Sequence, residues 1–312
     1  MAEHAPVMVT EVVEKLLHRS EGIYVDATFG RGGHSRALLA KLSPRARLIG
    51  LDRDQAAIDA GQLLAATEPR FTITKCRFGG LASALASMNI SQVDGILLDI
   101  GVSSPQLDDP SRGFSFRADG PLDMRMDTST GETAGDWLNH APVDEIAKVL
   151  RDLGEEKFAK RIAQRIVDHR PVEKTLELAE IISGAIPARS RSKESKHPAT
   201  RSFQAIRMHI NDELGELDAA LESAWRVLNP GGRLAVISFH SLEDRAVKQQ
   251  FRAWSQPPDL PRRMPIREEM LVAEGRLLGK PIKAGRRETE ENPRARSAIL
   301  RVIEKMDVTA DA

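Results

Sequence analysis

The chain has 312 residues, 41% of them hydrophobic, and its 45 Lys and Arg balance 45 Asp and Glu, so the formal net charge is zero. This length predicts about two domains, and the even mixture of charges excludes an acidic or basic disordered tail. Cys76 is the single cysteine, which excludes a disulfide scaffold and a zinc site of Cys-X-X-Cys pairs.

Residues 1–10 lack the basic and apolar regions of a signal peptide, and no apolar run approaches the ~20 residues that span a bilayer. We therefore expect a protein of the reducing cytoplasm with no membrane partner. The zero net charge at first argues against nucleic acid as a partner.

The first hundred residues alternate between short apolar runs and helical patterns. Strands are expected at 22–26, 47–52, 71–74 and 95–99, with helices at 35–42, 55–66 and 82–88. Elements of these lengths in this order predict an α/β fold with a doubly wound, mostly parallel sheet.

The next strand, 233–238, lies much farther from Asp99 than the ~30 residues of a βαβ unit, so a segment is inserted. Its first part, 108–130, is rich in Gly, Pro, Asp and Arg and predicts a long loop. Three helical stripes follow, around 146–153, 158–166 and 176–182, and one long amphipathic helix, 203–228, leads back to the sheet. With a last strand at 298–303, we expect an α/β domain formed by 1–107 and 203–312, interrupted by a small helical domain at 108–202.

A glycine-rich turn, 26–34, follows the first strand. Glycine lets a backbone turn tightly and approach a ligand, although a tight turn with no ligand explains the pattern as well. Asp52, 20 residues after Gly32, ends the second strand, where an acid can bind ribose hydroxyls. The pattern leaves a dinucleotide or S-adenosylmethionine. It is typical of the methyltransferase sequence acid-X-Gly-X-Gly-X-Gly with Thr28 in the first glycine position, and together with the turn at 229–234 it favours S-adenosylmethionine.

The fourth strand ends in Asp99 and a polar loop that reaches Gln106. Ligands of open α/β sheets bind at this edge, and both side chains could hydrogen-bond to an adenine or to a substrate amino group. A polar loop that only caps its strand is the alternative. Phe78 follows the third strand and could cover an adenine ring or belong to the core.

The position of Cys76, after the third strand, argues against C5 methylation of a pyrimidine through a thiolate. An exocyclic amine can instead attack the sulfonium methyl directly, which requires alignment and an acceptor for the amine hydrogens. Asp99 or a loop carbonyl could be that acceptor. The loop lacks the Asp-Pro-Pro-aromatic tetrad of many DNA amino-methyltransferases.

Seven segments resemble the family of bacterial small-subunit (16S) rRNA cytosine-N4 methyltransferases, in family order across nearly the whole chain. They are 28–35 (TFGRGGHS), 98–108 (LDIGVSSPQLD), 112–116 (RGFSF), 121–127 (PLDMRMD), 197–201 (HPATR), 237–245 (ISFHSLEDR) and 292–297 (NPRARS). The resemblance implies methylation of the N4 amine of a cytidine in the ribosomal decoding centre, with the small subunit as partner and without a metal. It also implies contacts with S-adenosylmethionine from Gly32, Gly33, His34, Asp52, Phe78, Asp99 and Gln106.

Several residues are candidates for contact with RNA. Phe114 and Phe116 could stack on an extruded base or could pin the long loop to the sheet. His197 and His240 are candidates by residue type, although each could simply be hydrogen-bonded in its loop. The segment 189–207, which includes Lys196 and Arg201, is strongly basic and predicts a phosphate-binding rim, with a solvated loop as the alternative.

Three other functions stay open: a DNA amino-methyltransferase, an RNA-binding assembly factor that retains cofactor affinity, and a small-molecule methyltransferase. The last would leave the insertion and the basic segment unexplained. The sequence does not decide between a monomer and a dimer.

Overall fold

The computed structural model describes residues 6–191, 197–257 and 272–307, which form two compact units. The sheet unit contains residues 1–101 and 214–312, and the helical unit contains residues 102–213. The helical unit therefore begins earlier and ends later than the predicted insertion at 108–202.

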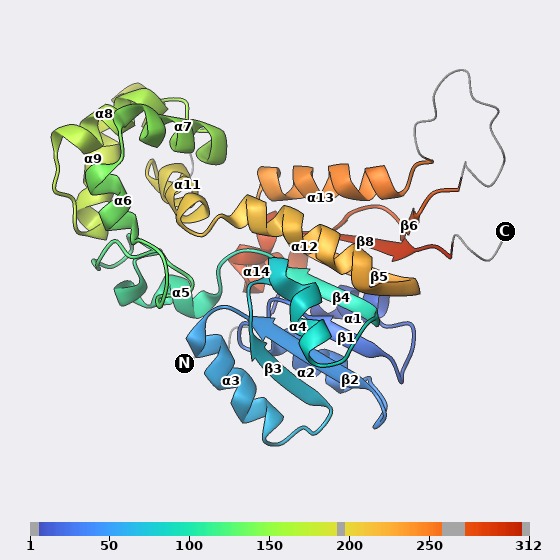
Figure 1. Ribbon diagram of the computed structural model, residues 1–312. Helices are drawn as coiled ribbons and strands as arrows, with labels where there is room; N and C mark the ends of the chain where they lie inside the picture. Colours follow the sequence, from blue (N-terminus) through green and yellow to red (C-terminus); the bar gives the residue numbers. More distant parts are fainter. Residues whose placement is uncertain (1–5, 192–196, 258–271, 308–312) are drawn as a thin grey trace. The chain divides into compact units, whose positions relative to one another are not determined.

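The sheet unit is built on a mostly parallel sheet. Its described strands are β1 (Ile23–Asp26), β2 (Arg47–Asp52), β3 (Phe71–Lys75), β4 (Val93–Asp99), β5 (Leu228–Ser238), β6 (Gly275–Leu277), β7 (Ile282–Lys283) and β8 (Ile299–Lys305). They form one eight-stranded sheet in the order β3-β2-β1-β4-β5-β8-β6, with β7 paired to β8 (Figure 1). Strands β1 to β5 are parallel, whereas β8 runs antiparallel to β5 and β6. The predicted doubly wound sheet is confirmed.

Helices cover both faces of this sheet because its central strands are apolar on both sides. The helices are α1 (Val9–Leu16), α2 (Gly33–Leu39), α3 (Gln55–Ala65), α4 (Leu81–Ser87), α12 (Glu213–Val227), α13 (Ser241–Trp254) and α14 (Arg286–Glu291). Neighbouring residues of one strand point to opposite faces. Leu97 accordingly packs in the core beneath α1, α2 and α3, whereas Leu98 packs in the core beneath α4, α12 and α13.

The strand order changes direction at β1. The chain proceeds from β1 to β2 and β3 on one side, then returns to place β4 on the other side of β1. Ligands of open α/β sheets bind at the carboxyl ends of the strands beside such a reversal. The fold therefore directs attention to the residues that follow β1, β2 and β4.

The helical unit has a core of its own. Its helices are α5 (Ser104–Asp108), α6 (Ala134–His140), α7 (Val143–Gly154), α8 (Ala159–Asp168), α9 (Thr175–Ala185), α10 (Ala188–Arg191) and α11 (Thr200–Ile210). The three predicted stripes coincide with α7, α8 and α9, and Ile146, Ile162 and Ile182 are fully buried in their common core.

The prediction of one helix over 203–228 is wrong. α11 ends at Ile210 and α12 begins at Glu213, because Asp212 adopts a left-handed conformation with φ of 46°. Asn211 donates from its side-chain amide to the Met124 carbonyl (2.7 Å), and its side-chain oxygen accepts from the Met126 amide (2.8 Å). Asn211, which lies at this break, therefore holds the loop around Met124 and Met126 against the end of α11.

The turn predicted at 229–234 lies inside β5. The register between β4 and β5 shifts between Val93 and Gly95, and Gly231 has φ of 77°, so the strand starts with an irregularity instead of a separate turn. Among the described residues, no helix combines the length and apolar character needed to cross a membrane.

Candidate functional site

The glycine-rich turn connects β1 to α2 and is closely packed. Gly32 has φ of 75°, and a Cβ at this position would lie 2.5 Å from the Phe29 ring. A Cβ on Gly33 would lie 2.5 Å from the side chain of Pro6. The turn therefore requires glycine at Gly32 both for its conformation and for its packing.

Asp52, at the end of β2, fixes this turn. Its carboxylate accepts hydrogen bonds from the backbone amides of Gly30 (2.8 Å) and Asp54 (2.9 Å). Burial raises the pKa of Asp52 to about 6, against the lowering effect of these two hydrogen bonds. Because each carboxylate oxygen can accept more than one hydrogen bond, Asp52 can hold the turn and still bind a hydroxyl group. The ribose contact of Asp52 stays a prediction.

Two further contacts fix the end of β1, one to α2 and one to the end of β4. The hydroxyl of Ser35 donates to the buried carboxylate of Asp26 (2.7 Å), whose pKa burial raises. Thr28 stands where the methyltransferase pattern has its first glycine, and its hydroxyl accepts from the backbone amide of Asp99 (2.6 Å). The hydroxyl of Thr28, which a glycine would lack, thus links the glycine-rich turn to the end of β4.

Asp99 and His34 face each other at the carboxyl edge of the sheet. The ring Nδ1 of His34 lies 3.6 Å from Oδ2 of Asp99, and its Nε2 lies 2.8 Å from the carbonyl oxygen of Val7. Because a carbonyl only accepts, Nε2 must carry a proton and donate it to Val7. His34 is thereby held with Nδ1 turned toward the carboxylate.

The second carboxylate oxygen of Asp99 has a different environment. Oδ1 is buried and has no hydrogen-bond partner among the described residues. Burial raises the pKa of Asp99 to about 6; His34 acts to lower it, and the charges of Asp26 and Glu243 act to raise it. A buried polar atom without a partner is costly, so Oδ1 is where a donor from a ligand would be accepted most favourably.

The other predicted cofactor contacts lie in separate units. Phe78 is partly buried in the sheet unit, in the 3-10 helix η1 (Phe78–Gly80), and packs against the core beneath α4. Gln106 is buried in α5 of the helical unit, where its side-chain oxygen accepts from the Ser103 amide (2.9 Å) in a capping box. Their contacts with a cofactor stay predictions.

Glu243 is a residue of this edge that the sequence reasoning missed. It is buried near the start of α13, and its Oε2 accepts from the amides of Phe239 (2.9 Å) and His240 (3.4 Å). His240 caps the same helix, with Nδ1 accepting from the Glu243 amide (3.5 Å). The spacing of His240 and Glu243 is that of a capping box, which is the signal that could have found it.

Cys76 does not have the character of a nucleophile. Burial and the nearby charge of Glu216 both raise the pKa of its thiol. A thiolate is the reactive form, so this environment disfavours covalent attack by Cys76, in agreement with the prediction from its position.

Two of the predicted RNA contacts are aromatic residues of the helical unit. Phe114 is 6% exposed and belongs to that unit's core, with the guanidinium of Arg112 5.7 Å from its ring centre. The ring of Phe116 lies 4.6 Å from that of His197 and 4.8 Å from that of Phe203. Phe114 thus fastens its loop to the helical core, and its contact with RNA, like those of Phe116 and His197, stays a prediction.

The basic segment is only partly as predicted. Arg207 donates from Nε and Nη2 to both oxygens of the buried Glu213 (2.7 Å each), so this arginine forms an internal ion pair instead of part of a phosphate-binding rim. Lys196 lies outside the described residues. Arg201 is half-buried in the first turn of α11, and its role in RNA binding stays a prediction.

Comparison with known proteins agrees with this arrangement. The model of the MraW methylase family matches residues 1–306. A ribosomal RNA small subunit methyltransferase H from Thioalkalivibrio sulfidiphilus (strain HL-EbGR7) is 52% identical over 308 residues, which cover 97% of each chain. The crystal structure of an rRNA methylase from Streptococcus thermophilus is 12% identical, with 98% of this chain and 99% of that chain covered and a TM-score of 0.42, a likeness too distant to add to the fold described above.

Proposed function

Because the chain belongs to the MraW methylase family, we propose that it methylates the N4 amine of a cytidine in the decoding centre of small-subunit (16S) rRNA, by direct in-line transfer. The protein is a methyltransferase, and S-adenosylmethionine is its cofactor. The relative's name supports small-subunit rRNA as the acceptor, and the seven sequence segments support the amine and its position. The proposal places the enzyme in the cytoplasm, where ribosomal subunits are found.

The residues at the carboxyl edge of the sheet fit this cofactor. When bound, S-adenosylmethionine supplies a methyl group on a positively charged sulfur. The turn around Gly32 would let the backbone approach it, and Asp52 would accept hydrogen bonds from the ribose hydroxyls. These are the residue types that the ends of β1 and β2 provide in a nucleoside-binding α/β sheet.

The observation that carries the proposal is the buried oxygen of Asp99 that lacks a partner. In our proposal this oxygen accepts a hydrogen bond from the exocyclic amine of cytosine and so directs the nitrogen lone pair toward the methyl group. With a pKa of about 6, Asp99 is mainly ionised at neutral pH and can also take the proton that the amine loses after transfer. Water could take the same proton, because a protonated cytosine amine is strongly acidic.

A direct assay tests the function. The enzyme is incubated with S-adenosylmethionine tritiated in its methyl group and with small ribosomal subunits from cells that lack the activity. After digestion to nucleosides, we expect the label in N4-methylcytidine. Label in another nucleoside, or none, contradicts the proposal, and a Cys76→Ser variant should retain activity.

Two further arms address the alternatives. Preferential labelling of duplex DNA over subunits would identify a DNA amino-methyltransferase. If Asp99→Ala abolished transfer but retained full cellular function, the protein would act as an assembly factor. Naked rRNA in place of subunits tells which form is the acceptor.

A further inference from the structure

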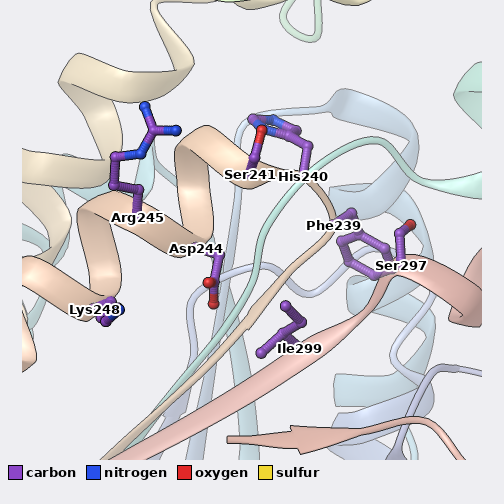
Figure 2. A pocket seen from close by; sticks show the side chains of 8 residues that line it. All are labelled: Phe239, His240, Ser241, Asp244, Arg245, Lys248, Ser297 and Ile299. Carbon is purple, nitrogen blue, oxygen red and sulfur yellow. The ribbon is translucent and has the colours of Figure 1, made fainter.

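An open pocket of about 460 Å³ lies in the sheet unit, where β5 leads into α13 and the 3-10 helix η4 (Pro293–Ser297) leads into β8 (Figure 2). Its apolar lining comes from Phe239 and Ile299, and hydroxyl groups come from Ser241 and Ser297. These residues belong to the segments 237–245 and 292–297 or adjoin them, and the proposed cofactor contacts use neither segment. A volume of this size is ordinary for a small-ligand site.

The pocket lies on the far side of β4 from the proposed cofactor residues. Asp99 is paired in register with Ile237, and Ser238 with Ile299, so the pocket begins about one strand spacing, ~4.8 Å, from the strand of Asp99. The cofactor residues Gly32 and Asp52 follow β1 and β2 on the opposite side. A ligand in the pocket would therefore lie on the opposite side of β4 from Gly32 and Asp52.

The charge of the lining favours an anion. Asp244 is the acid of the pocket, and Arg301 binds both of its carboxylate oxygens (2.8 and 3.0 Å), which compensates its charge. Lys248 and Arg245 line the same pocket from α13, and both are exposed. Lys248 has no ion-pair partner in the part of the chain that the structure describes, so its charge is available to a ligand.

The pocket thus combines an aromatic face, hydroxyl groups and cations within one small volume. A nucleotide offers the matching features, a flat base, sugar hydroxyls and a phosphate.

We propose that this pocket binds an RNA nucleotide next to the cytidine that is methylated, with its base against Phe239 and its phosphate at Lys248 and Arg245. The inference rests on the proposed function, because the RNA strand must bring its neighbouring nucleotide to the pocket when the target amine reaches Asp99. It assigns the β5–β8 edge of the sheet to acceptor binding and the β1–β2 edge to the cofactor.

The test compares two charge reversals on one helix. Lys248→Glu alters the pocket, whereas Arg252→Glu makes the same charge change one turn further along α13, outside the pocket lining. The dissociation constant for small subunits is measured over a series of salt concentrations with S-adenosylhomocysteine present, and cofactor affinity is measured by calorimetry. A Phe239→Leu variant removes the aromatic face and retains an apolar side chain.

We expect Lys248→Glu to weaken subunit binding about tenfold and to reduce the slope of log K against log salt by ~0.7, the value for one lost phosphate contact on a single strand. Arg252→Glu should stay within about twofold of the wild type. Phe239→Leu should weaken binding by a similar factor without changing the salt slope, because stacking carries no charge. Cofactor affinity should be unchanged in all three.

Equal losses in Lys248→Glu and Arg252→Glu, no loss in Lys248→Glu, or a parallel loss of cofactor affinity would each overturn the inference. These outcomes differ from failure of the proposed function, which appears as the absence of N4-methylcytidine with the wild-type enzyme. A wild-type enzyme that makes N4-methylcytidine and a Lys248→Glu variant with normal subunit binding would leave the function standing and remove the pocket from it.

Discussion

Acids at the carboxyl edge of the sheet differ in their partners from two acids of the helical unit. In the helical unit, Glu213 and Asp123 each bind an arginine through both carboxylate oxygens, with contacts of 2.7 Å to Arg207 and of 2.9 and 2.7 Å to Arg125. At the carboxyl edge of the sheet, the acids that end β1, β2 and β4 have no Lys or Arg partner among the described residues. Those acids are Asp26, Asp52 and Asp99.

This difference distinguishes acids that are paired within the chain from acids that can still accept a hydrogen bond from a ligand. A paired acid has its charge compensated before any ligand arrives, and removing its partner would leave that charge uncompensated. An acid that lacks such a partner retains hydrogen-bonding capacity and carries a raised pKa, as Asp52 and Asp99 do.

The largest expected effect follows from removing the charge of Asp99. Asp99→Asn retains the size of the side chain but removes its charge and replaces one carboxylate oxygen by a hydrogen-bond donor, so we expect methyl transfer to fall at least ~100-fold with subunits as acceptor. Single-turnover rates at saturating cofactor measure this loss. A loss of less than about tenfold would show that the charge of Asp99 is not needed for transfer.

The next effect concerns a paired acid of the helical unit. Arg207→Ala leaves Glu213 buried without its partner, and we expect the free energy of unfolding of that unit to drop by ~3–5 kcal/mol. Denaturant titration measures the drop. The double variant Arg207→Met with Glu213→Leu should recover most of the stability. A loss of less than about 1 kcal/mol in Arg207→Ala would show that Arg207 is not needed to compensate the charge of Glu213.

Two glycines with similar backbone conformations allow a smaller and sharper comparison. Gly32 and Gly231 have φ of 75° and 77°, but a Cβ on Gly32 meets the Phe29 ring whereas one on Gly231 meets nothing within 4 Å. Both alanine variants should lose ~1 kcal/mol or more of stability through backbone strain. Only Gly32→Ala should weaken cofactor binding, by about tenfold in calorimetry, and equal cofactor affinities would show that the packing of the turn does not matter.

The smallest expected effect is a change in how stability depends on pH. Asp52 and Asp99 have pKa values of about 6 in the folded protein, above the ~3.9 of an unfolded chain. Between pH 4 and 6 the folded state therefore holds more protons, and the free energy of unfolding should fall as pH rises through this window.

Urea titrations between pH 4 and 7 measure that decline. The double variant Asp52→Asn, Asp99→Asn should show a flatter profile than the wild type. A wild-type profile that rises over this window would contradict the raised pKa values.

Elements with strong periodicity could be predicted from the sequence, and those that depend on distant contacts could not. β2 occupies the predicted residues Arg47–Asp52 because an uninterrupted apolar run fits a strand buried on both faces. The break at Asp212 was missed because the apolar stripe continues across it, although Asn211 and Asp212 are residue types that end helices. The two short strands β6 and β7 and the antiparallel direction of β8 depend on pairing that no local pattern contains.

The candidate site shows the same limit. The positions of Asp52 and Asp99 at strand ends could be predicted, because a strand ends where its apolar run ends. The contact of His34 with Asp99 could not, because it requires the register of β1 against β4 and the hydrogen bond of His34 to Val7. Glu243 was missed for a similar reason, since its carboxylate serves the turn after β5.

The position of β8 has a consequence for the synthesis of the protein. Residues 299–305 are synthesised after every other described strand of the sheet, yet β8 lies between β5 and β6 in the interior of the sheet. Until they emerge, the nascent chain exposes the full edge of β5, whose unpaired amides and carbonyls can pair with another chain. A premature stop codon shortly before residue 299 should therefore yield an aggregating product even though the residues of the proposed site have already been made.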